Sequence, residues 1–268
     1  MSARAVTQTN DVPARRPDGL VTRGRRRPMA KPLKEWVETD VEYQRSQPLK
    51  WISEEHFFRD PSRPMFSDPA YFFAPADGVI LYQLWAEPND CIVEIKGKPY
   101  SLRRAMQDDA FDARCLVIGI FMTMYDVHIN RLPYKGFLSY KPLEPISTLN
   151  RPMLEVEHGL VHDLVIDHSQ AEYLHTNQRV LNRVYAPDLQ QSYYILQIAD
   201  YDVDCITPFN LGQNVAVAQN ERFSQIRFGS QVDLIVPASK RFHFELIHTI
   251  GMHVEAGIDP LIKVVRKV

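Results

Sequence analysis

The sequence has 268 residues, 45% of them apolar, and carries a formal net charge of -2. This length and apolar content suffice for a sizeable core, so the composition indicates one large globular domain or a domain with an appendage. A charge near zero excludes a protein that attracts polyanions through its overall charge, and we expect no nucleic-acid partner.

Residues 1–32 form a basic segment that we expect to be a disordered tail. Its basic residues include Arg15, Arg16, Arg23, Arg25, Arg26, Arg27 and Lys31, and Lys34 follows just beyond it. Prolines and glycines interrupt the segment, and few acidic residues oppose its charge. Each basic residue near an anionic lipid surface contributes about 1 kcal/mol of attraction. A solvated leader without a partner explains the same composition equally well.

Helical patterns precede strand patterns along the chain. Residues 33–43 and 54–58 mix apolar and charged residues as short helices do, and 100–105 predicts another brief helix. After Asp77, apolar runs bounded by turn residues predict strands at 79–85, 92–96, 116–122, 194–198, 214–219 and 225–236. Many short strands with few helices predict an α+β, β-rich fold, a barrel or sandwich with short N-terminal helices at one end.

Two Gly-x-x-Val spacings, at 212–215 and 251–254, are similar to the turns of biotinyl and lipoyl carrier folds. They imply a barrel-sandwich-hybrid-like β domain within the predicted domain, 33–268. A carrier domain displays a lysine on a tight hairpin between methionines, and this chain has no such segment. We therefore expect the similarity to be structural only.

The chain has no predicted membrane span, secretory signal or metal site. Its longest apolar run covers 115–125, whereas a helix needs roughly 20 apolar residues to cross a bilayer. The arginine-rich start lacks a following apolar stretch and cleavage site. Cys91, Cys115 and Cys205 lack the short spacing of a zinc site, so we expect reduced thiols. These features predict a cytoplasmic protein that would meet a lipid substrate peripherally.

Gly229 and Ser230 stand between two apolar β-type runs within 225–237. A serine hydroxyl becomes nucleophilic when a neighbouring base takes its proton, and a strained peptide bond lowers the barrier to an N-to-O acyl shift. If the resulting ester loses its α-proton, the carboxylate of Gly229 leaves, and the remaining dehydroalanine hydrolyses to a pyruvoyl group at position 230. By itself, Gly-Ser is also an ordinary turn dipeptide or the site of a β-bulge.

Several separated segments, in the same order along the chain, carry a resemblance to a known family. They are 57–59 with Arg63-Pro64, Pro75-Ala76-Asp77-Gly78, 124–133 with Gly136, and 220–223 leading into 227–233. The set resembles the phosphatidylserine decarboxylase family, and is most similar to its short, soluble-type members, including archaetidylserine decarboxylases. The resemblance covers about residues 50–265. Ala74 stands where the family's Ser-Pro-Ala-Asp-Gly motif has its serine.

The resemblance implies a self-processing enzyme. Ser230 would act as the nucleophile and then carry a covalently bound pyruvoyl cofactor, after cleavage into a β chain, 1–229, and an α chain, 230–268. Asp77 would orient a histidine or tune its charge, although an aspartate in such a turn also caps its own backbone. His128 would transfer protons, because an imidazole pKa near 6.5 suits neutral pH.

The histidine pattern departs from that of the family. Many bacterial members have two histidines three positions apart in this segment, one for self-cleavage and one for decarboxylation, whereas this chain has His128 and then Arg131. Either His128 serves both steps, or Arg131 or a distant histidine replaces the missing one. His158 and His162 are spaced to share a helical face, but their surroundings predict strand and loop, so we do not favour them.

The implied activity is the conversion of phosphatidylserine to phosphatidylethanolamine and carbon dioxide in phospholipid biosynthesis. The substrate amine would condense with the pyruvoyl ketone, and His128 would protonate the carbon from which carbon dioxide leaves. Arg59, Arg63 and Arg131 suit a lipid phosphate, but solvated or salt-bridged roles explain them equally well. Similar proteins commonly form dimers, so the resemblance allows a homodimer of processed heterodimers at an anionic membrane surface.

Two other functions stay open. A decarboxylase of the same family could act on a free aromatic amino acid, and the basic tail favours a lipid over this substrate. The chain could also be an unprocessed binding protein with a hybrid fold. The joint presence of Asp77, His128 and Gly229-Ser230 speaks against this last function.

Overall fold

The computed structural model describes residues 30–63, 67–144, 149–201, 205–227 and 229–267. Most of the predicted tail, residues 1–32, lies outside these ranges. The last two residues of that segment, Lys31–Pro32, form strand β1 and pair with a strand near the other end of the chain. The backbone N–H of Ala30 also donates to Oδ1 of Asp259 at 3.0 Å, so the described part of the chain is bound to the domain from its first residue.

The helical elements are short and lie in three regions. The first contains α1 (Leu33–Trp36), η1 (Val37–Val41), α2 (Glu42–Arg45), α3 (Leu49–Trp51) and η2 (Ile52–His56). The second is α4 (Leu102–Met106), and the third contains α5 (Leu154–His158), η3 (Gly159–Asp163), η4 (His168–Gln170) and α6 (Tyr173–Thr176). The first two regions agree with the predicted helices, whereas the third was not predicted. None of the helices within the described ranges has the length and apolar character needed to cross a bilayer.

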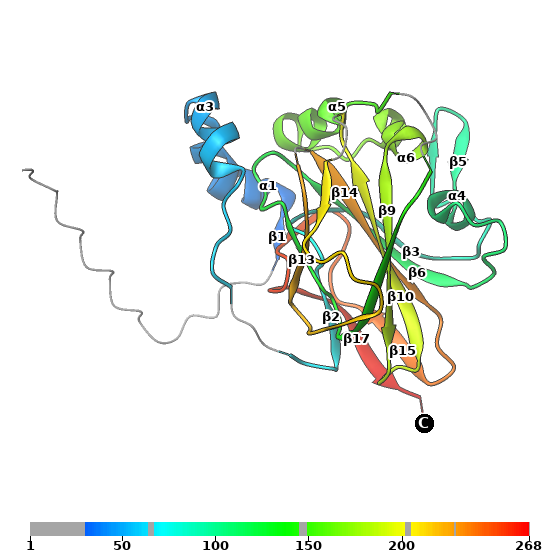
Figure 1. Cartoon of the computed structure of the whole chain (residues 1–268). Coiled ribbons are helices and arrows are strands. Elements are labelled where there is room, and N and C mark those ends of the chain that lie inside the picture. Colours follow the sequence, from blue (N-terminus) through cyan, green and yellow to red (C-terminus); the bar gives the residue numbers. More distant parts are fainter. Residues whose placement is uncertain (1–29, 64–66, 145–148, 202–204, 228, 268) are drawn as a thin grey trace, which may run out of the picture.

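Nine strands form one antiparallel sheet (Figure 1). In sheet order they are β1 (Lys31–Pro32), β16 (Met252–Val254), β3 (Gly78–Ala86), β6 (Cys115–Met122), β14 (Ser230–Pro237), β10 (Gln191–Ala199), β9 (Arg179–Ala186), β8 (Gly136–Pro142) and β12 (Val215–Val217). The sheet has open edges at β1 and β12, so its described strands do not close into a barrel. The predicted α+β, β-rich class is confirmed.

Three smaller sheets accompany the large one. One contains β11 (Ile206–Pro208), β13 (Arg222–Ile226) and β7 (Ile129–Arg131), and another contains β15 (Phe242–Leu246), β17 (Pro260–Arg266) and β2 (Tyr71–Phe73). The third is the hairpin of β4 (Val93–Ile95) and β5 (Lys98–Tyr100).

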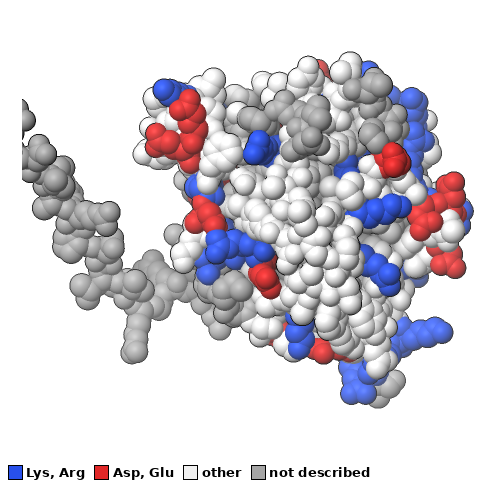
Figure 2. All heavy atoms as spheres, viewed as in Figure 1, with Lys and Arg blue, Asp and Glu red and all other residues white. Residues whose placement is uncertain are grey.

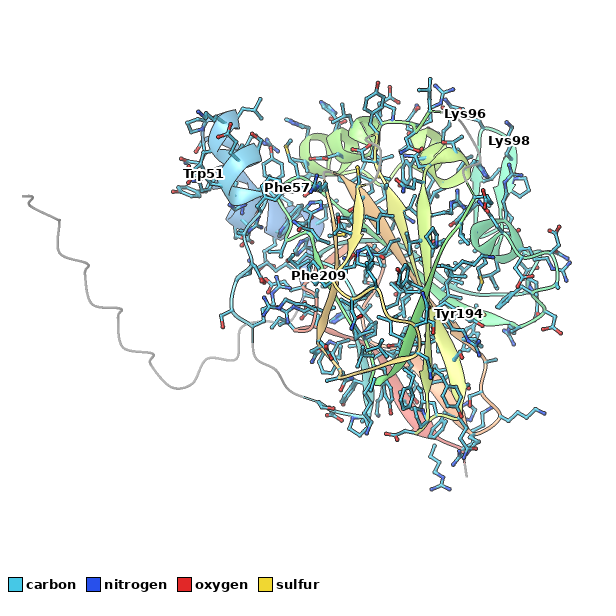
Figure 3. The ribbon with its side chains drawn as sticks, viewed as in Figure 1. Trp51, Phe57, Lys96, Lys98, Tyr194 and Phe209 are labelled. Carbon is cyan, nitrogen blue, oxygen red and sulfur yellow. The ribbon has the colours of Figure 1, made fainter. Side chains whose placement is uncertain are left out.

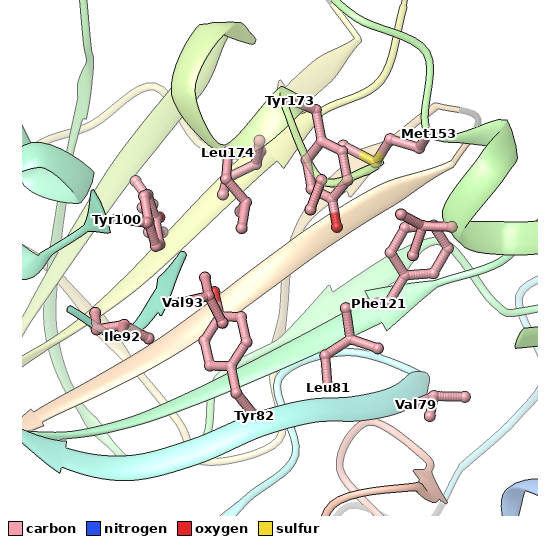
Figure 4. Close-up of a cluster of buried hydrophobic side chains, with 14 of the residues drawn as sticks. Val79, Leu81, Tyr82, Ile92, Val93, Tyr100, Phe121, Met153, Tyr173 and Leu174 are labelled. Carbon is pink, nitrogen blue, oxygen red and sulfur yellow. The ribbon is translucent and has the colours of Figure 1, made fainter. Parts of the chain in front are cut away.

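Both faces of the large sheet are buried at its centre. Along β6, Val117 and Phe121 join a core under the helices, which Figure 4 shows in part. Leu116, Ile118 and Ile120 join a second core, shared with the two three-stranded sheets. A strand covered on both faces has no solvent-facing side, which explains the continuous apolar character of β6. The fold therefore has three layers, with the large sheet in the middle.

A buried polar network fixes β14 to the helix-side core. Asp233 accepts hydrogen bonds from the hydroxyls of Tyr82 at 2.9 Å and Tyr100 at 3.2 Å, and from Nε2 of Gln231 at 2.7 Å. Oε1 of Gln231 accepts a bond from the hydroxyl of Tyr173 at 2.8 Å. Burial raises the pKa of Asp233 to about 6, and these hydrogen bonds oppose the shift. The strand is thus held firmly just after its first residue.

The predicted strand 225–236 is two strands in different sheets. β13 pairs with β7 in a small sheet, whereas β14 pairs with β6 and β10 in the large one. The chain therefore leaves one sheet after Ile226 and enters the other at Ser230. The sequence concealed this junction, because both apolar runs are β-type and only a short connection separates them.

Candidate functional site

Ser230 begins β14 at the centre of the large sheet. It pairs with Met122 of β6 on one side and with Ala199 of β10 on the other. The residue is fully buried, and its hydroxyl donates to Sδ of Met122 at 3.2 Å. Because a thioether is a weak acceptor, the hydroxyl proton is only weakly engaged by this contact.

Gly229 lies against two carboxyl groups. A Cβ atom at this position would stand 2.9 Å from Oδ2 of Asp200 and 3.8 Å from Oε2 of Glu157. Any larger residue would therefore press against the Asp200 carboxylate. The absence of a side chain at 229 lets the backbone next to Ser230 approach both acids closely.

Glu157 comes from α5, at the end of the sheet where β14 begins (Figure 1). It is 9% exposed, and its Oε1 accepts the backbone N–H of Met124 at 3.1 Å. Burial, together with the charges of Asp126 and Asp200, raises its pKa to about 7 against the opposing effect of the bond from Met124. Glu157 can therefore exchange protons near neutral pH.

His128 is fully buried beside the end of β6. Its Nε2 lies 2.9 Å from the carbonyl oxygen of Thr123, the residue that follows Met122. Since a carbonyl only accepts, Nε2 carries the hydrogen and Nδ1 carries the lone pair. Nδ1 has no hydrogen-bond partner among the described residues. The ring packs on Phe57 with 4.2 Å between centroids, and Figure 3 labels Phe57 where the N-terminal helices face the sheets.

Burial lowers the pKa of His128 to about 4, and the hydrogen bond to Thr123 opposes this shift. The imidazole is therefore neutral at pH 7, with Nδ1 able to accept a proton.

Asp77 is bound to an arginine. Its two carboxylate oxygens each accept from Arg63 at 2.6 Å, and Oδ1 also accepts the backbone N–H of Ala256 at 2.8 Å. This bidentate geometry matches the planar guanidinium. The expected contact between Asp77 and a histidine is not found among the described residues. Asp77 acts on His128 and His253 through its charge. For His128 this charge opposes the lowering of the pKa by burial, and for His253 it adds to the raised pKa.

The buried carboxylate–imidazole pair in this structure joins Asp126 to His253. Oδ1 of Asp126 lies 2.7 Å from Nε2 of His253, and Oδ2 accepts from the backbone and hydroxyl of Thr123. Burial by itself lowers the pKa of His253, but the charge and hydrogen bond of Asp126 outweigh it and raise the pKa. The ring also stacks on Trp36 of α1 at 4.3 Å.

The three arginines predicted to meet a lipid phosphate bind protein acceptors. Arg59 donates to the carbonyl oxygens of Tyr125, Asp126 and His56, at 2.5, 3.2 and 2.8 Å. Arg63 binds Asp77, and Arg131 donates to the carbonyl oxygen of Asn220 at 3.0 Å. Their contacts in the structure correspond to the structural alternative that the sequence left open.

His158 and His162 lie on a helix, not in strand and loop as predicted. They belong to α5 and η3, and their rings stack with centroids 4.5 Å apart. Both are exposed, and His158 also contacts Asp163 at 3.3 Å. The predicted helical spacing is correct, but the titratable residue that this helix buries beside them is Glu157.

Sequence reasoning missed Glu157, Asp200 and the pairing of Asp126 with His253. Asp126 and His253 stand inside segments that the sequence had singled out, but 127 positions separate them. Asp200 directly follows β10, and a carboxylate at a strand end was an available signal. Glu157 offered none, because its helix was not predicted.

Comparisons with known proteins place this site in a family. A family model described as phosphatidylserine decarboxylase matches residues 55–260. A phosphatidylserine decarboxylase proenzyme of Erythrobacter litoralis is 32% identical over 184 residues, 68% of this chain and 63% of the relative. Another from Chlorobium phaeobacteroides is 26% identical over 189 residues, 69% of this chain and 68% of the relative.

A protein of Methanocaldococcus jannaschii assigned as an archaetidylserine decarboxylase proenzyme is 27% identical over 203 residues, 75% of this chain and 85% of the relative. The chain thus spans less than two thirds of the Erythrobacter relative and most of the archaeal one. The family match includes Asp77, His128 and Ser230, and covers well over half of the chain. The family recognised from the sequence is confirmed, and with it the prediction of a decarboxylase at the level of the family. The chain belongs to the phosphatidylserine decarboxylase family.

Proposed function

We propose that the protein is a precursor that cleaves itself between Gly229 and Ser230 and then decarboxylates phosphatidylserine to phosphatidylethanolamine. The observation that carries the proposal is the place of this dipeptide, at the junction of two sheets with the Ser230 hydroxyl buried. Cleavage would separate residues 1–229 from 230–268, and β14 would stay bound between β6 and β10. The relatives named as proenzymes support this chemistry.

Position 230 suits a pyruvoyl group formed from its own serine. The group would stand at the free start of β14, between Met122 and Ala199, where the chain is fully buried. When formed, its ketone supplies an electron sink for breaking the bond to the departing carboxyl group. Burial would exclude water from the reacting carbon.

We assign proton transfer during decarboxylation to His128. Its Nδ1 lone pair can take up a proton and deliver it to the carbon that loses carbon dioxide. Thr123 and Phe57 fix the orientation of the ring. Asp77, bound to Arg63, would favour the protonated ring through its charge without touching it.

A phospholipid fits the surface near the site better than a free amino acid does. Tyr201, next to Asp200, is 61% exposed, and Phe209 and Leu211 are also exposed. Figure 2 shows a broad, mostly uncharged area in the middle of the viewed face, and Phe209 lies within it (Figure 3). Exposed apolar side chains of this kind suit acyl chains. We propose peripheral action at an anionic, cytoplasmic membrane surface; a homodimer of processed heterodimers stays a prediction.

Release of carbon dioxide from vesicles that contain phosphatidylserine tests this function. We expect the purified protein to release it from the vesicles and not from free serine or aromatic amino acids. Ser230→Ala should abolish release, because it removes the source of the ketone. Release from a free amino acid alone would replace the lipid substrate, and full release by Ser230→Ala would refute the mechanism.

A further inference from the structure

Self-cleavage requires a group that moves protons at the Gly229-Ser230 bond. Attack by Oγ of Ser230 on the carbonyl carbon of Gly229 forms a C–O bond and breaks the C–N bond, and the hydroxyl proton ends on the freed amine. The α-proton of residue 230 is then removed, the Cβ–Oγ bond breaks and the carboxylate of Gly229 leaves. Water then replaces the nitrogen, which departs as ammonia. An acid–base group beside residues 229 and 230 would serve these transfers.

The residues that the sequence offered for this task are poorly suited to it. Arg131 stays protonated at neutral pH and donates to the carbonyl oxygen of Asn220. His158 and His162 stack on the exposed side of their helix. His128, with a pKa of about 4, is a weak base.

Two acids approach the bond in a similar way. Oε1 of Glu157 is held by the backbone N–H of Met124 at 3.1 Å, and Oε2 lies 3.8 Å from the Cβ position of Gly229. Oδ1 of Asp200 is held by the backbone N–H of Met153 at 2.9 Å, and Oδ2 lies 2.9 Å from the same position. In each carboxyl group, a backbone amide fixes one oxygen and the other oxygen lies beside Gly229.

We propose that Glu157 is the base that removes the α-proton of residue 230 during self-cleavage and that Asp200 is a positioning residue that tunes it. The inference rests on the proposed self-cleavage and names the group that performs its elimination step. The Ser230 hydroxyl points to Met122, on the face of the sheet opposite the helices, so Glu157 faces the backbone at residue 229 and not Oγ. As a carboxylate, Glu157 takes the α-proton of residue 230, the Cβ–Oγ bond breaks and the carboxylate of Gly229 leaves.

The charges around Glu157 suit both forms of the group. Burial, with the charges of Asp126 and Asp200, raises its pKa to about 7, so both forms are populated at neutral pH. Tyr125 also interacts with Glu157, and His253 binds Asp126 from the opposite side. Cleavage should therefore accelerate as pH rises through about 7, because ionisation produces the base.

Glu157→Gln tests the proposal, with Glu155→Gln as its matched control on the exposed side of α5. Full-length chains made by cell-free translation at graded pH can be followed by gel as residues 1–229 and 230–268 separate. General acid–base groups contribute about 10²–10⁴-fold, so we expect Glu157→Gln to cleave about 100-fold more slowly or worse, without the inflection near pH 7. Glu155→Gln should behave as the unchanged protein.

Asp200→Asn gives a second readout that does not require the loss of Glu157. Removing the negative charge eases ionisation of Glu157, so the inflection should move to lower pH, whereas a merely structural role would change the rate and not the inflection. Thermal unfolding identifies any variant that fails to fold, and if Glu157→Gln is such a variant, the inflection of Asp200→Asn decides the assignment.

The outcomes separate this inference from the proposed function. If the unchanged protein cleaves but Glu157→Gln cleaves at the same rate with the same inflection, the assignment of Glu157 is wrong and self-cleavage stands. An unmoved inflection in Asp200→Asn also overturns the assignment. A protein that never cleaves refutes the proposed function itself.

Discussion

A side chain at Gly229 would press on the carboxylate of Asp200, beside the proposed cleavage bond. Gly229→Ala places a methyl group 2.9 Å from the Asp200 oxygen, and a backbone bond from Met153 restrains that side chain. We expect the variant to lose about 1–3 kcal/mol of stability through overpacking. Self-cleavage should be about 10-fold slower, because the displaced carboxylate no longer positions the bond. Thermal unfolding and a gel assay of cleavage measure both effects, and an unchanged rate would show that close approach of Asp200 is irrelevant.

At the residue scale, sequence reasoning found residues with local signals and missed those that only folding brings together. Ser230 and His128 stand in short ordered motifs, and the structure connects them through Met122 and Thr123. Asp77 was expected to orient a histidine or tune its charge; its hydrogen-bond partner is Arg63, a guanidinium 14 positions away, and its charge still acts on His128. Composition and spacing carry no information about such a choice between partners.

At the element scale, the pair of Asp126 and His253 connects the turn after β6 to β16, and Trp36 stacks α1 on the same imidazole. The folded-state pKa of His253 is raised above its ordinary value of 6.5. Its protonation therefore stabilises the fold below about pH 6.5, and this contribution is lost as pH rises through the folded pKa.

His253→Gln should lower the free energy of unfolding by about 1.5–3 kcal/mol at about pH 6, since it removes a hydrogen-bonded charge pair. The difference from the unchanged protein should shrink as the pH rises above the folded-state pKa of His253, where the residue is neutral in both states. Denaturant unfolding across this range measures it, and His128 contributes equally to both proteins. A difference that is independent of pH would contradict the charged pair.

Most predicted elements are present, and the errors have physical causes. The strand predicted at 116–122 is β6, a long apolar run buried on both faces. The strand predicted at 225–236 is two strands, because its halves pair with different sheets. Such long-range pairing leaves no mark in the local periodicity of the sequence. The helical segments within 154–176 are short and depend on packing for their stability, so their sequence pattern is weak.

At the scale of the whole molecule, the layered fold explains how a chain can be cut without coming apart. β14 lies in the middle of the large sheet, hydrogen-bonded to β6 and β10 along its length, and both of its neighbours belong to 1–229. The segment after it returns as β17 to pair with β2. The two predicted products would therefore remain one folded body, with the new end of the chain buried at the site.

Intact-mass spectrometry of the purified protein under denaturing conditions tests the central claim most directly. The account predicts two chains, residues 1–229 and a second chain from position 230 to 268 that begins with a pyruvoyl group, and a single uncut chain for Ser230→Ala. A decarboxylating protein that consists only of the intact 268-residue chain would contradict it.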